Sequence, residues 1–120
     1  MRTKKIWAEE NTGEIRLLVA SLQLADSFWS RLKGLLGTAA LSEGEGLLLR
    51  PCNCVHTCGM RYAIDVLFLD SGGRILKLAQ ELAPWRSVCC WKAAAVLELP
   101  AGTVQRQELQ TGQQLRRNWF

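Results

Sequence analysis

The sequence predicts a mainly β fold, a small antiparallel sandwich or barrel with one short amphipathic helix near residues 27–36. About seven short apolar segments are separated by turn residues, and one segment alone has helical spacing. The alternation of strand and helix that a parallel sheet requires is missing. With 120 residues the chain has the size of one domain. We expect residues 1–12 to be a flexible N-terminal segment and residues 13–120 to be a single β-rich domain.

The first half of the chain contains both patterns. Residues 13–26 are apolar with partial alternation, which suits one bent strand or two short strands. In the next segment the large apolar residues recur at helical spacing: Phe28, Trp29, Leu32, Leu35 and Leu36. Asp26 or Ser27 can cap this helix and Gly37 can end it.

The remaining segments read as short strands divided by turns. Further strands are predicted for residues 46–50, 62–70, 74–82, 95–102 and 112–117. Ser71, Gly72 and Gly73 predict a tight hairpin, because glycine supplies the positive φ that such a turn demands. Residues 103–109 fit a helical turn.

Composition and charge argue against two classes of partner. No stretch approaches the 18 or so consecutive apolar residues of a membrane span. The polar N-terminus leaves no room for the apolar core of a signal peptide, so we expect a cytosolic protein. The net charge is +4, but the basic residues are scattered. Nucleic-acid binding requires a concentrated basic stripe and is therefore not expected.

The most reactive side chains are concentrated in "PCNCVHTCGMRYAIDVLFLD", residues 51–70. On one extended strand Cys52, Cys54, His56 and Cys58 share a face, with the ends of the set about 20 Å apart. Tetrahedral zinc needs donor atoms within about 4 Å of one another. A metal site would therefore need a bend or ligands from elsewhere, and we expect no cofactor; if a metal binds, Cys54, His56 and Cys58 are its candidate ligands.

Thiol catalysis is the other chemical interpretation of this stretch. His56 stands two residues from both Cys54 and Cys58, so either thiol could be activated by the imidazole. In a reducing cytosol, however, a cysteine among aliphatic residues is more often a packing residue than half of a crosslink. Cys89 and Cys90 would point to opposite faces of a strand. We therefore favour a non-catalytic protein.

Two acidic residues lie inside apolar strands. Asp65 shares a face with Leu67, where an ionised carboxylate is costly unless it is paired or accepts hydrogen bonds. It is either a structural acceptor that pins a loop or pairs with Arg31 or Arg61, or a residue of a binding pocket. Glu98 raises the same question, although an edge strand could simply expose it.

Several segments together resemble the prokaryotic family called domain of unknown function 192. The resemblance covers roughly residues 14–117 in the family's order and spacing, and it rests on "RLKGLL" (31–36), "GLLL" (46–49), "VHTCGMRYAIDVLFLD" (55–70), "APW" (83–85) and "VLELPAG" (96–102). It implies a jelly-roll-like sandwich or barrel. It implies no assigned enzymatic activity, because the family is uncharacterised.

The family pattern also bears on single residues. Many members have "F-W-M-K-N-T" where this chain has "VHTCGM". Other members have an apolar residue at the place of Cys58, which favours packing there. The resemblance directs attention to a polar cluster of Arg31, His56, Thr57, Asp65 and Glu98.

Together these observations predict a cytosolic binding or accessory module for a small ligand or a protein partner. Its site would be the polar cluster around His56 and Asp65. The alternative is a small metal-binding or cysteine/histidine-dependent enzyme that uses His56 with Cys54 or Cys58.

Overall fold

A computed structural model describes residues 3–25, 41–57 and 60–118. Its strands are β1 (Ile6–Glu9), β2 (Ile15–Val19), β3 (Ser21–Ala25), β4 (Glu45–Leu49), β5 (Cys54–His56), β6 (Ile64–Leu69), β7 (Ile75–Leu82), β8 (Ser87–Cys89), β9 (Ala95–Pro100) and β10 (Leu115–Arg117). The described helix is α2 (Thr103–Arg106). In the described part of the chain no helix has the length and apolar character to cross a membrane. The helix predicted near residues 27–36 lies outside the described residues.

The mainly β class is confirmed, and the strands form three sheets. Their orders are β3-β4-β9-β6-β7, β10-β1-β2 and β5-β8. Among the described strands, none of these sheets closes into a barrel. The expectation of antiparallel pairing is wrong for one pair, since β3 and β4 run parallel. Residues 26–44 connect them, which is long enough for the crossover that parallel neighbours require.

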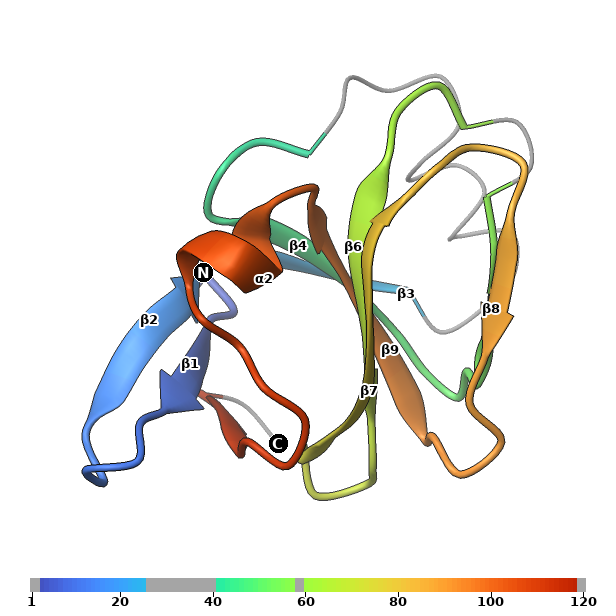
Figure 1. The fold of residues 1–120 in the computed structure, drawn as a ribbon. Helices are drawn as coiled ribbons and strands as arrows, with labels where there is room; N and C mark the ends of the chain where they lie inside the picture. Colours follow the sequence, from blue (N-terminus) through green and yellow to red (C-terminus); the bar gives the residue numbers. More distant parts are fainter. Residues whose placement is uncertain (1–2, 26–40, 58–59, 119–120) are drawn as a thin grey trace.

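The five-stranded sheet is the middle layer of the molecule (Figure 1). On one face Leu67 and Leu97 share a hydrophobic cluster with Ile6 of β1 and Leu115 of β10. On the other face a second cluster includes Val55 of β5, with Val88 of β8 packed against it. Because β6 and β9 are covered on both faces, their sequences are nearly continuous apolar runs rather than alternating ones.

Two predicted turns are confirmed. β6 and β7 form an antiparallel hairpin around residues 71–73. Gly73 has a φ of +89°, and a Cβ there would lie 3.0 Å from the carbonyl oxygen of Leu115, so only glycine allows the turn to approach β10 this closely. The helical turn expected within residues 103–109 is α2.

The N-terminal strand was not predicted. β1 falls inside the segment 1–12 that we expected to be flexible, and it pairs with β2 on one side and β10 on the other. Ile6 and Ala8 of this strand are buried in the first hydrophobic cluster.

Candidate functional site

Asp65 is fully buried in β6 and binds two main-chain groups. Its Oδ1 accepts the N–H of Glu81 and its Oδ2 accepts the N–H of Val104, both at 2.8 Å. Glu81 has a left-handed φ of 50° where the β6–β7 register shifts. Val104 is in the first turn of α2, whose N–H groups have no partner within the helix. The carboxylate therefore ties β7 and α2 to β6, as the structural interpretation of Asp65 requires.

Glu98 is also fully buried, but it faces the other way. Asp65 is the register partner of Leu99, a member of the first cluster, whereas Glu98 is the partner of Val66, a member of the second. Cross-strand partners share a face of the sheet. The two acids thus lie on opposite faces and do not form one site.

His56 is exposed on the ribbon of β5 and β8, where its Nδ1 lies 2.8 Å from Oγ of Ser87. This ribbon covers the second cluster, on the face of the five-stranded sheet away from Asp65. The structure therefore does not bring His56 and Asp65 together. Arg31, also expected in the polar cluster, lies outside the described residues.

Thr57, directly after β5, is fully buried and holds a turn. Its Oγ1 donates to the carbonyl oxygen of Ala83 (2.7 Å) and accepts the N–H of Arg86 (2.8 Å). Its own carbonyl oxygen accepts the N–H of Trp85 at 3.1 Å. Trp85 is held at a φ of 63° with 67% of its surface exposed.

Cys54 and Cys89 are register partners across the ribbon and form a disulfide. The expectation that the cysteines are packing thiols rather than crosslinks is wrong for this pair, because strand register across 35 positions is not visible in local sequence. Cys52 and Cys90 are free thiols packed against the second cluster, which agrees with a packing role.

The disulfide also bears on the enzymatic alternative. While the sulfur of Cys54 is bound to Cys89 it is not a nucleophile for His56 to activate. Cys58, the other candidate thiol, lies outside the described residues. Within residues 3–25, 41–57 and 60–118, no three His, Cys, Asp or Glu side chains form a group that could hold a metal ion.

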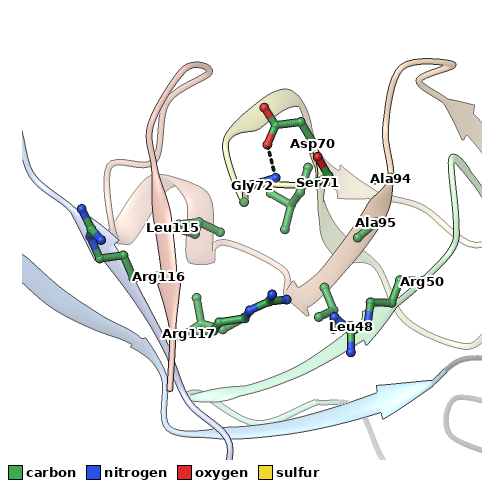
Figure 2. Close-up of a pocket in the computed structure, with 13 residues that line it drawn as sticks. Leu48, Arg50, Asp70, Ser71, Gly72, Ala94, Ala95, Leu115, Arg116 and Arg117 are labelled. Atoms are coloured by element: carbon green, nitrogen blue, oxygen red, sulfur yellow. Dashed lines mark hydrogen bonds between the residues drawn. The ribbon is translucent and has the colours of Figure 1, made fainter. Parts of the chain in front are cut away.

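A pocket of about 350 Å³ opens on the face of the five-stranded sheet that lies away from the ribbon of β5 and β8. It is located where β4 and β6 end and β9 begins (Figure 2). β10 and the turn of residues 70–73 form its other walls. Its apolar lining includes Ala94 and five members of the first hydrophobic cluster, Ile6, Leu48, Leu69, Ala95 and Leu115.

The turn that walls the pocket is held in place by hydrogen bonds. Oδ1 of Asp70 accepts the N–H groups of Gly72 and Arg74, both at 2.9 Å. The carbonyl oxygen of Gly73 accepts the N–H of Leu115 at 2.9 Å. The turn is therefore fastened to β10 by hydrogen bonds of the protein itself.

Three arginines and one aspartate are the charged residues of this lining. Figure 2 shows Arg117 extending from β10 over the apolar floor and Arg50 beside Leu48 on the other side. Arg116 points away from the pocket in the same view, and its Nε lies 3.1 Å from Oε2 of Glu9. The pocket thus combines an apolar floor with two arginines at its sides.

Sequence reasoning missed this pocket. The pocket is built from segments far apart along the chain, namely Arg50, the turn at 70–73 and Arg117. They meet only because β4 and β6 end, and β9 begins, at the same end of the five-stranded sheet. Two signals were present, the adjacent pair Arg116 and Arg117 and the two glycines of the hairpin. Neither indicated that they would meet.

Comparisons with known proteins agree on the family and the fold. The sequence model of the DUF192 family, described as an uncharacterized ACR, matches residues 8–117. A UPF0127 protein from Thermococcus sibiricus is 28% identical over 116 residues, which is 92% of this chain and 68% of that protein.

Two crystal structures have a similar fold. A protein from Sinorhizobium meliloti, described as a candidate transcription regulator, superposes with a TM-score of 0.82 at 24% identity, covering 96% of this chain and 94% of the other. A protein of unknown function from Novosphingobium aromaticivorans gives a TM-score of 0.79 at 18% identity, covering 93% and 83%. At these identities the likeness concerns the fold alone.

Proposed function

Because the chain belongs to the DUF192 family, which has no assigned activity, we propose its function from the geometry of the domain. The protein is a non-catalytic binding module, and a small ligand binds in the pocket between β10 and the end of the five-stranded sheet where β4 and β6 finish.

The observation that carries this proposal is the pocket itself. Its volume of about 350 Å³ falls in the range of roughly 300–1,000 Å³ that small-molecule sites occupy. Such sites typically combine a mostly apolar lining with a few polar groups that orient the ligand. The floor of Leu48, Leu69 and Ala95 and the flanking arginines follow that pattern.

The proposal is tested by titrating hexan-1-ol and hexanoate into ¹⁵N-labelled protein. We expect the amide signals of Leu69, Gly72 and Ala95 to shift with saturation. Ala94→Phe, which adds a ring at a residue of the pocket lining, should abolish the shifts, whereas Lys92→Phe, at an exposed position outside the lining, should retain them. Circular dichroism checks that both variants are folded. Absence of saturable shifts in the wild-type protein would refute the pocket as a ligand site.

A protein partner is the second candidate, and Trp85 favours it. A left-handed φ costs a non-glycine residue roughly 1–2 kcal/mol, and Trp85 is held there with its indole exposed. Exposed tryptophans are common anchors of protein interfaces. A photo-reactive amino acid at position 85 should crosslink one protein in cells, and the same group at Trp91, which is 80% exposed, should not. Equal labelling from both positions would contradict a partner at Trp85.

For the fold, we propose a jelly-roll-like sandwich as the finer description. The three-stranded and five-stranded sheets share one hydrophobic cluster, which supports two packed layers. An experimental structure in which these two sheets do not pack face to face would contradict it.

The compartment is tested through the disulfide. The cytosolic location expected from the sequence requires that Cys54 and Cys89 are mostly reduced in the cell, whereas an oxidising compartment keeps them crosslinked. Alkylation of thiols in intact cells before lysis, followed by mass spectrometry, distinguishes the two locations.

A further inference from the structure

We propose that the pocket recognises an organic anion, a molecule with an apolar body and one carboxylate or phosphate group, and that Arg50 and Arg117 bind the anionic group. This inference rests on the proposed function and names the class of ligand.

The charges around the pocket favour an anion over a cation. Arg50 and Arg117 flank the apolar floor, and the acid in the lining is Asp70. One carboxylate oxygen of Asp70 already accepts two main-chain N–H groups of its own turn. Arg116 is directed to the far side of β10, where it meets Glu9. Apart from Arg116, the charged residues of the lining are therefore two arginines and one aspartate.

The two arginines suit an oxyanion in particular. A guanidinium group presents five N–H donors in a plane and can bind both oxygens of a carboxylate or phosphate. Arg117 already makes a contact within the protein, and its guanidinium group has five N–H donors in all. Because Arg50 is half-buried beside an apolar floor, its attraction for an anion is less screened than on an open surface.

The floor argues against a bare inorganic anion. Leu48, Leu69 and Ala95 offer no hydrogen-bond donors from their side chains, and burial of apolar ligand atoms against them is favourable. An alkyl chain can lie over this floor while its charged end reaches the arginines. The expected ligand therefore has both an apolar chain and an anionic group.

The test compares probes with the same six-carbon chain and different head groups. Dissociation constants for hexanoate, hexyl phosphate, hexan-1-ol and hexylammonium are measured from the amide shifts of the pocket. We expect at least one of the two anions to bind about tenfold more tightly than hexan-1-ol, and hexylammonium to bind more weakly than hexan-1-ol. The anion with the lower dissociation constant shows whether the pocket prefers a carboxylate or a phosphate group.

Variants separate the charge effect from the pocket. Arg50→Gln combined with Arg117→Gln should bring the preferred anion to within about twofold of hexan-1-ol and leave hexan-1-ol binding unchanged. Arg86→Gln removes the same type of charge from an exposed position outside the pocket and should change nothing. An equal loss of anion binding in Arg86→Gln would overturn the assignment, because net charge alone would then explain it.

The outcomes also distinguish this inference from the proposed function. Equal affinity for anion, alcohol and ammonium would overturn the organic-anion inference while the pocket remains a ligand site. Binding of inorganic phosphate as tightly as hexyl phosphate would overturn the requirement for an apolar body. If none of the four probes binds, the proposed function itself fails.

Discussion

Replacement of Asp65 tests whether its carboxylate holds three elements together. In Asp65→Asn one oxygen remains, but an NH₂ group replaces the other and faces a main-chain N–H. In Asp65→Leu both acceptors are lost, which leaves the buried N–H of Val104 and the partly buried N–H of Glu81 without them.

The expected magnitudes follow from the two hydrogen bonds. A hydrogen bond to a charged group contributes about 1.5–3 kcal/mol, and part of that gain offsets the cost of burying the carboxylate. We expect Asp65→Asn to lower the free energy of unfolding by about 2 kcal/mol and Asp65→Leu by about 4 kcal/mol. Since small domains are stable by only about 5–15 kcal/mol, the leucine variant should lose a large share of its stability.

The assay is urea unfolding followed by tryptophan fluorescence, with hydrogen exchange at the amides of Glu81 and Val104 as a local readout. Asp70→Asn is the control, because asparagine can accept the same turn hydrogen bonds at an accessible site. We expect it to cost less than about 0.5 kcal/mol. If Asp65→Asn and Asp70→Asn lower the free energy of unfolding equally, and hydrogen exchange at Glu81 and Val104 is unchanged, the buried hydrogen bonds of Asp65 contribute no more than exposed ones. That result would refute the reasoning.

Two further changes test the packing and the crosslink. Replacing Cys54 and Cys89 together by alanine should lower the free energy of unfolding by about 3–4 kcal/mol, because the disulfide closes a loop across 35 positions of the unfolded chain; an unaltered urea midpoint would contradict this. Gly46→Ala would place a methyl group 3.2 Å from a methyl of Val19 and should cost about 1–3 kcal/mol. Gly72→Ala, whose nearest neighbour would be 3.5 Å away, should leave the melting temperature nearly unchanged.

The disulfide could not be predicted from the cysteine content of the chain. An odd number of cysteines in a protein expected to be cytosolic predicts free thiols. In the structure the pairing of Cys54 with Cys89 leaves two free thiols among the described residues. Cysteine connectivity depends on which strands are neighbours, and that information is absent from the spacing.

The separation of Asp65 from His56 could not be predicted either. The two residues are close in sequence and chemically distinctive, which predicts a shared site. Strand alternation and the ribbon of β5 and β8 place them on opposite sides of the five-stranded sheet. A shift of one residue reverses the direction of every side chain in a strand, so residue spacing across an irregular segment does not predict a shared face.

Local sequence patterns are sufficient to predict the elements that depend on neighbouring residues. The apolar runs of β6 and β9, the hairpin at residues 71–73 and the turn of α2 were all predicted, because periodicity and turn residues act within a few positions. The pairing of β1 with β10 and the placement of Arg50 and Arg117 around one pocket arise only in the folded chain. Those contacts join residues far apart in the chain, and they form only once the sheets share a core.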